Sequence, residues 1–125
     1  MNEYAADRLN RARRALKTAQ ILQAEGDYDG SALRAYYAAF YAVSALFAVE
    51  GKRFKKHSAV ESALHKDLIQ TGRLPKTLGG DYAALRLFRN TGDYGDLEHV
   101  TAEQAAKAIE ASRRILDDIN LLLPS

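Results

Sequence analysis

The stretch from Ser31 to Glu50 constrains the fold of this chain more than any other segment. Its large apolar residues recur in alternating steps of three and four, which lays one continuous stripe along an α-helix. This stripe comprises Leu33, Tyr36, Phe40, Val43 and Phe47. Alanine fills most of the other positions, so the predicted helix is nearly apolar on all sides. We therefore expect other helices to cover it on several faces, as the central helix of a bundle.

A second, more polar stripe lies one residue further along the same predicted helix. It contains Arg34, Tyr37, Tyr41 and Ser44. An arginine on a mostly buried helix needs partners, because a buried charge that has lost its partner costs about 3–5 kcal/mol. The sequence leaves two alternatives for Arg34, which are an internal brace and the wall of a cleft.

Helix-end signals predict further helices around this one. With the central helix, the predicted set covers residues 3–25, 31–50, 58–72, 81–91 and 101–123. Ser58 and Thr101 each precede a Glu or Gln by three residues, which is the capping-box pattern of a helix start. Asp81 is the expected N-cap of the fourth helix, and the candidate caps of the central helix are Asp27, Asp29 and Ser31.

The fold class follows from the missing strand signal. No stretch alternates between apolar and polar residues for long enough to predict a strand. Short segments join the predicted helices, which favours antiparallel neighbours. We predict a single all-α domain over residues 1–125, an up-and-down bundle of four to five antiparallel helices.

The amino-acid composition limits the cellular compartment and the kinds of chemistry that we expect for this chain. The chain has no cysteine, which excludes disulfides, thiolate catalysis and Cys-based zinc sites and fits a reducing, cytoplasmic setting. The first residues are studded with charge and do not resemble a signal peptide. The uncharged stretch from Ala35 to Val49 is shorter than the roughly 20 residues that a bilayer requires, so we expect no membrane association.

Positive charge is concentrated in the first half of the chain. The formal net charge is only +2, which does not by itself argue for nucleic acid. One side of the first predicted helix is nevertheless crowded with Arg8, Arg11, Arg13, Arg14 and Lys17. Such a run is usually a solvated face, and phosphate contact is the sharper alternative.

Metal and cofactor sites have little support in the sequence. Asp93, Asp96, Glu98 and His99 are close in sequence, but acidic residues ahead of a helix ordinarily serve capping and solvation. The chain lacks a glycine-rich phosphate loop. We expect no metal and no cofactor.

Three stretches together resemble the HEPN family of small helical bundles. They are residues 34–41 (RAYYAAFY), 56–60 (KHSAV) and 89–96 (RNTGDYGD). The resemblance implies a helical up-and-down bundle that forms homodimers. It also implies a prokaryotic setting in which the protein stands beside a small nucleotidyltransferase, as half of a toxin-antitoxin-like pair or as its substrate-binding helper.

Many members of this family are metal-independent endoribonucleases with an Arg followed, after four to six residues, by a His. Arg89 fits the signature, but Tyr94 occupies the His position and the next histidine is His99. Cleavage of RNA without metal needs a base that titrates near neutral pH and a cation for the phosphorane charge. Tyr94, with a reference pKa near 10, suits hydrogen-bond donation better than proton abstraction. His57 and His65 are the alternative bases.

Three hypotheses remain open at this point. In the first, Arg89, Asp93, Tyr94 and the Arg34, Tyr37 and Tyr41 stripe bind a phosphate-bearing ligand, RNA or nucleotide, beside a nucleotidyltransferase partner. In the second, the chain is a ribonuclease with a displaced histidine, and its catalytic residues are Arg89, Tyr94 and His57. In the third, these residues only lock the end of the fourth helix, and the chain is a structural or dimerisation module.

Overall fold

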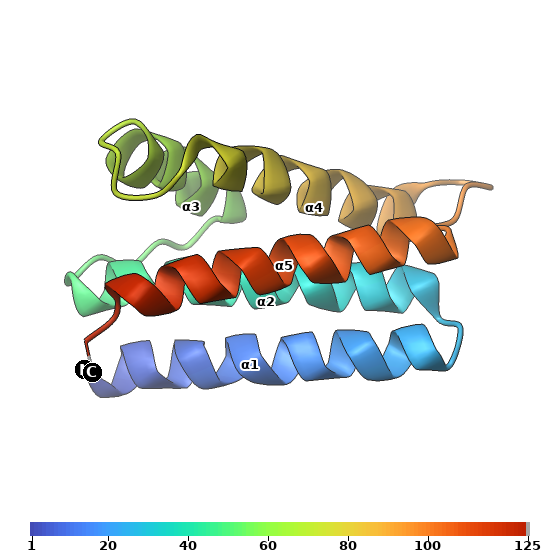
Figure 1. Cartoon of the computed structure of the whole chain (residues 1–125), viewed down its shortest axis with the longest axis horizontal. Coiled ribbons are helices and arrows are strands. Elements are labelled where there is room, and N and C mark those ends of the chain that lie inside the picture. Colours follow the sequence, from blue (N-terminus) through green and yellow to red (C-terminus); the bar gives the residue numbers. More distant parts are fainter. Residues whose placement is uncertain (125) are drawn as a thin grey trace.

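Helices account for almost all of the regular structure in the computed structural model, which describes residues 1–124. In chain order the elements are α1 (Glu3–Ala24), α2 (Tyr28–Val49), α3 (His57–Ala63), the π-helical segment η1 (Leu64–Ile69), α4 (Lys76–Tyr94) and α5 (Ala102–Leu122). Residues 1–124 contain no strand, so the predicted all-α bundle is confirmed. The long helices run side by side, with α1 on one flank and α3 and α4 on the other (Figure 1).

Helix α2 is the centre of the bundle, as its sequence predicts. It packs against α1, α4 and α5, and the side chains of Tyr36, Val43, Leu46 and Phe47 are almost fully buried. Alanines on α1 and α2 are fully buried as well, and their small side chains allow the two helices to approach closely. Leu33, the first member of the apolar stripe, stays partly exposed.

Helix α2 begins earlier than the predicted segment, residues 31–50. Tyr28–Val49 has 22 residues and a mean hydropathy of 1.4 in its most apolar window, so by length and composition it could cross a membrane. Within the bundle, 67% of that window is buried against other helices. Its apolar character is therefore accounted for by the protein core.

Several predicted helix ends are confirmed. Gly26, Gly51 and Gly72 have φ values of 84°, 81° and 80°, in the left-handed region that glycine adopts without strain. Of the three candidate caps of α2, Asp27 makes the bond, because its Oδ1 accepts from the Gly30 amide at 2.9 Å. The capping box between Thr101 and Gln104 is formed in both directions.

The predicted capping box at Ser58 is wrong. Helix α3 begins at His57, with Lys56 as N-cap and no side-chain cap bond. Ser58 lies inside the first turn, and the Glu61 carboxylate forms an ion pair with Arg86 of α4 at 3.1 Å. Glu61 therefore connects α3 to α4 instead of closing the end of its own helix.

The predicted limits of the fourth helix, Asp81 and Thr91-Gly92, are also wrong. Helix α4 starts directly after Pro75, whose ring fixes a φ of −70° at the N-cap, and it continues to Tyr94. Gly79 and Gly80 are helical; a Cβ at Gly79 would lie 3.0 Å from Cε1 of His65, so this glycine lets α4 approach η1. Asp81 caps nothing and instead binds Arg114 of α5 through two hydrogen bonds.

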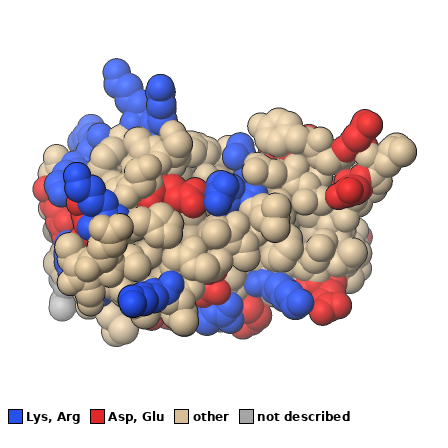
Figure 2. Space-filling model, turned by 90° about the horizontal axis from the view of Figure 1, so that it is seen from above, with Lys and Arg blue, Asp and Glu red and all other residues tan. Residues whose placement is uncertain are grey.

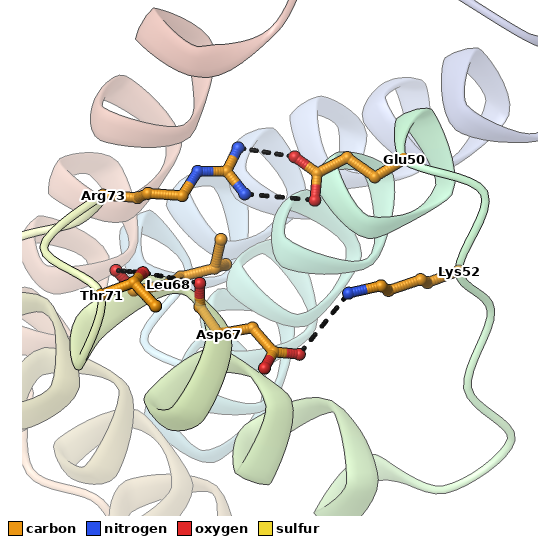
Figure 3. Close-up of polar contacts among 6 residues, drawn as sticks. All are labelled: Glu50, Lys52, Asp67, Leu68, Thr71 and Arg73. Atoms are coloured by element: carbon orange, nitrogen blue, oxygen red, sulfur yellow. Dashed lines mark hydrogen bonds and ion pairs between the residues drawn. The ribbon is translucent and has the colours of Figure 1, made fainter.

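Polar contacts hold η1 against the C-terminal end of α2 (Figure 3). The Arg73 guanidinium binds both carboxylate oxygens of Glu50, and Lys52 lies 3.7 Å from the Asp67 carboxylate. Thr71 donates to the Asp67 carbonyl at 2.7 Å. The hydrogen bonds from Arg73 lower the pKa of Glu50. These contacts fix the position of η1, and with it that of α3, which continues directly into η1.

Candidate functional site

Tyr36 joins three helices at the centre of the candidate site. The residue is only 2% exposed, yet its hydroxyl forms a 3.2 Å hydrogen bond with Nδ1 of His57 at the start of α3. The guanidinium carbon of Arg89, from α4, lies 5.1 Å from the centroid of the same ring. Residues that are distant in sequence therefore meet around one tyrosine. Helical periodicity predicts only the place of Tyr36 in the core and gives no signal of this second role.

Arg89 carries hydrogen-bonding capacity that the described residues leave unused. Its side chain is 19% exposed, and its Nε atom is buried without a hydrogen bond within residues 1–124. The Asp93 carboxylate is 3.5 Å from Nε, beyond the 2.7–3.2 Å typical of N–H···O hydrogen bonds. The ring of Tyr94 lies 5.9 Å from the guanidinium carbon, and this tyrosine is 73% exposed. The surroundings of Arg89 are thus aromatic, with one loosely placed carboxylate.

His57 is held in an aromatic environment beside this cation. Its ring centroid lies 4.1 Å from that of Phe40 and 5.5 Å from that of Tyr37. Burial lowers the pKa of His57, and the positive charge of Arg89 lowers it further. The imidazole is therefore neutral at neutral pH. When Nδ1 donates to the Tyr36 oxygen, Nε2 has a lone pair that can accept a proton.

Arg34 and Tyr41 belong to a second group of residues, between α1 and α2. Together with Asp7, Arg11 and Arg14 they line a cavity of about 190 Å³. The Arg34 guanidinium carbon lies 5.7 Å from the Tyr37 ring centroid, and its Nε is buried without a hydrogen bond within residues 1–124. Of the two alternatives for Arg34, the structure favours the cleft wall over an internal brace.

Tyr37 lies between the two groups. Its ring centroid is 5.6 Å from that of Tyr36 and 5.8 Å from that of Tyr41. The constellation predicted as one site therefore consists of two basic centres, at Arg89 and at Arg34, joined by a row of aromatic rings on α2. Sequence spacing along α2 indicates the Tyr37–Tyr41 part of this row, because residues four apart share a helix face, but not the contact between the adjacent Tyr36 and Tyr37.

The other two histidines make their contacts outside the group around Tyr36. His65 faces Gly79 and lies 3.9 Å from the Glu61 carboxylate. His99 bonds Oδ2 of Asp29 at 2.7 Å, while the Val100 amide donates to Oδ1 of the same carboxylate. Burial acts to raise the pKa of Asp29, but these two hydrogen bonds outweigh it and the pKa is lowered. His99 thus ties the loop after α4 to the first turn of α2.

Comparison with models of known protein families identifies the family of this chain. The HEPN domain model matches residues 5–122. The chain belongs to the HEPN family. The predicted resemblance, which rests on residues 34–41, 56–60 and 89–96, is confirmed over nearly the whole sequence.

Two relatives extend this HEPN assignment. The chain is 37% identical to a UPF0332 protein of Thermotoga maritima over 113 residues, which cover 90% of this chain and 86% of the relative. It is 30% identical over 97 residues to MJ0142 of Methanocaldococcus jannaschii, whose name describes it as a candidate toxin. That match covers 78% of this chain and 66% of MJ0142.

Solved structures share the HEPN bundle. TT1696 from Thermus thermophilus superposes with a TM-score of 0.83 at 24% identity, over 98% of this chain and all of its own. ST0689, described as an archaeal HEPN homologue, gives a TM-score of 0.75 at 20% identity, over 95% of this chain and 97% of its own. At these identities the likeness establishes the fold.

In this HEPN chain the position of the signature histidine is taken by an exposed tyrosine, Tyr94. The imidazole that lies near Arg89 comes instead from His57, which bonds the hydroxyl of the tyrosine whose ring Arg89 covers. A guanidinium can hold an anion, and a neutral imidazole beside it can accept a proton from a nearby hydroxyl. Asp96, Glu98 and His99 form no metal cluster, because residues 1–124 contain no group of three His, Asp or Glu side chains placed to hold an ion.

Charged side chains are unevenly distributed on the face over α3 and α4. Basic side chains are most numerous at the end of this face that holds α3, where some acidic ones lie among them, and acidic side chains mark the end where α4 leads into α5 (Figure 2). Arg89 and His57 draw their neighbours from α2, α3 and α4. An anionic ligand would approach such a face in a preferred orientation.

Proposed function

We propose that this HEPN protein binds a phosphate-bearing ligand, RNA or a nucleotide, at Arg89. The observation that supports this most strongly is the Arg89 side chain, which is largely buried and whose Nε has no hydrogen bond within residues 1–124. A phosphate oxygen would supply an acceptor for its free N–H groups. A buried donor left without a partner costs about 1–3 kcal/mol, so a ligand that satisfies it gains a corresponding advantage.

The aromatic residues around Arg89 suit the base of an RNA or nucleotide ligand. Tyr94 is 73% exposed, and its ring lies beside the guanidinium. Nucleobases stack on exposed aromatic rings, while the planar guanidinium forms paired hydrogen bonds with phosphate. Arg89 would therefore hold the phosphate and Tyr94 the base, with Asp93 limiting the room beside Nε.

The setting that we propose is a toxin-antitoxin-like pair in the cytoplasm. The HEPN family assignment supports it, as does the name of MJ0142, which describes that relative as a candidate toxin. In this setting a small nucleotidyltransferase is the partner protein and the HEPN chain is its ligand-binding helper or target. Co-purification of the chain with the product of a neighbouring nucleotidyltransferase gene tests the partnership.

The experiment for the binding site compares two arginine variants on RNA binding. Fluorescence anisotropy with a labelled oligouridylate, in the presence of a chelator, gives the affinity. Arg89→Gln should weaken binding by about 1.5–3 kcal/mol, the range for a hydrogen bond to a charged group. Arg113→Gln removes the same charge from an exposed site on α5 and serves as the control. If both variants bind like the wild type while Arg89→Gln changes only the melting temperature, Arg89 has a structural role.

The second candidate function is a metal-independent ribonuclease with a displaced histidine. The observation that favours it is the position of His57, which shares the Tyr36 ring with Arg89 and has a lowered pKa. This candidate predicts that the wild type cleaves RNA in chelator and that His57→Ala abolishes cleavage. His65→Ala, a histidine outside this group, is the control. Intact RNA after prolonged incubation with the wild type would rule out this candidate.

A further inference from the structure

The cavity between α1 and α2 carries unbalanced positive charge. Arg11 and Arg14 reach it from α1, and Arg34 and Tyr41 from α2, around a volume of about 190 Å³. Asp7 is the one carboxylate among its lining residues, and its Oδ2 is already bonded to Nε of Arg11 at 2.9 Å. Three guanidinium groups therefore surround the cavity, and one carboxylate balances one of them.

The remaining arginines have few acceptors of their own. Within residues 1–124, Arg14 takes part in no ion pair, and the buried Nε of Arg34 makes no hydrogen bond. Arg8 lies next to the cavity wall, 5.3 Å from the Tyr41 ring centroid, and its buried Nε also lacks a partner in that part of the chain. Buried donors without partners cost free energy, and an anion in the cavity would satisfy them.

The cavity is connected to the Arg89 centre by aromatic rings. Tyr41 lines the cavity, and its ring lies 5.8 Å from that of Tyr37 with an interplanar angle of 32°. Tyr37 in turn lies 5.6 Å from Tyr36, the ring that Arg89 covers. Tyr37 and Tyr41 are both partly exposed. Proteins bind single-stranded nucleic acid by combining basic groups that hold the backbone with aromatic rings on which bases stack, and this part of the chain offers both.

From these observations we infer that the cavity between α1 and α2 is a second phosphate subsite, and that the ligand is a single-stranded RNA of several nucleotides. This inference rests on the proposed function, since it assigns Arg89 to one phosphate of the strand and the cavity to another. Bases between the two phosphates stack on Tyr37 and Tyr41. A mononucleotide reaches one subsite alone.

Charge-matched double variants on α1 test the inference. Arg11→Gln/Arg14→Gln removes two charges from the cavity lining. Arg13→Gln/Lys17→Gln removes two charges from exposed positions of the same helix that do not line the cavity. All four side chains are exposed, so both variants should fold, which circular dichroism verifies. Anisotropy with labelled oligouridylate is measured over a range of salt concentrations in chelator, beside wild type and Arg89→Gln.

The cavity variant should bind oligouridylate about tenfold or more weakly than the matched control, as expected for loss of a charge-assisted contact. Its plot of log affinity against log salt should be shallower than that of the control by about 0.7, the contribution of one phosphate contact on a single strand. Binding of uridine monophosphate at Arg89 should be the same in both double variants.

Each other result overturns at least one of the two proposals. If the cavity variant and its control bind the oligonucleotide equally while Arg89→Gln weakens binding, the second subsite is wrong and the proposed function stands. If the cavity variant weakens binding and Arg89→Gln does not, the cavity binds phosphate and the Arg89 site is wrong. If wild type binds no oligonucleotide, both are wrong.

Discussion

At the scale of single residues, the candidate site depends on Tyr36, whose hydroxyl bonds His57 and whose buried ring lies against Arg89. His57 and Arg89 meet there because α3 and α4 both pack against α2. The motif residues 34–41 and 56–60 draw attention to this region in the sequence. The meeting of His57 and Arg89 at Tyr36 is not predictable from sequence spacing. It depends on how α3 and α4 approach each other across a turn and a π-helical segment.

The first prediction concerns the histidine of the family signature, whose position Tyr94 occupies. Tyr94→His places an imidazole that titrates near neutrality at an exposed position beside Arg89. We expect this variant to gain metal-independent cleavage of RNA, measured on gels in the presence of a chelator. Adding Arg89→Ala should abolish the gain. Failure of Tyr94→His to cleave would argue that the arrangement around Arg89 does not support ribonuclease chemistry.

The second prediction concerns the pH dependence of stability. Burial and Arg89 lower the pKa of His57 in the folded state, while the unfolded imidazole has an ordinary pKa of about 6.5. Above that value both states are neutral, and His57 contributes no pH dependence. As the pH falls below it, the unfolded chain binds the proton first, so the folded state loses stability down to the lowered pKa.

Melting temperatures between about pH 5 and 8 test this expectation for His57. His57→Gln should lose less stability than the wild type toward the acidic end of the range. His65→Gln, a substitution of a histidine outside the Tyr36 group, is measured beside it. An unchanged profile in His57→Gln would show that the protonation of His57 is not linked to folding.

At the scale of elements, the interiors of the helices were predictable and several boundaries were not. The stripes of α2 and α5 follow directly from helical periodicity, because burial of one face dictates it. Gly79 and Gly80 fall between the predicted helices 58–72 and 81–91, yet both lie in α4. Leu78 and Gly79 are buried, and this packing outweighs the weak helix propensity of glycine. Thr91 and Gly92 likewise continue the helix, since Gly92 lies close to the backbone of Asp29.

Two separate alanine substitutions in α4 test how closely the helix packs at Gly79 and Gly80. A Cβ at Gly80 would meet no atom within 4 Å, so Gly80→Ala should raise the free energy of unfolding by about 0.5–1 kcal/mol. A Cβ at Gly79 would lie 3.0 Å from His65 and 3.2 Å from Ile69, so Gly79→Ala should gain less than Gly80→Ala or lose stability. Urea denaturation measures both. Equal gains would mean that α4 and η1 are not closely packed at this point.

At the scale of the whole molecule, the family resemblance predicts self-association. Leu87 in α4 and Leu97 in the loop after it are 62% and 90% exposed. A second copy packed against these two leucines would remove apolar surface from water. We expect a dimer by sedimentation velocity at micromolar concentration.

Two leucine variants locate the contact. Leu87→Glu should shift the protein toward monomer if α4 forms the interface, whereas Leu121→Glu on α5, at an 83% exposed position, should not. A wild type that sediments only as a monomer at this concentration would contradict the predicted dimer.

A contact between Arg89 and the phosphate of a ligand can be observed directly by NMR. The Nε–H resonance of Arg89 is assigned by its disappearance in Arg89→Lys and is followed in a titration with a 5′-phosphorylated oligouridylate in chelator. Since Nε of Arg89 has no hydrogen bond within residues 1–124, we expect a large, saturable shift of this resonance, whereas that of Arg113 on α5 should stay unchanged. An Arg89 resonance that stays fixed while other arginine resonances shift at saturation would contradict phosphate binding by Arg89.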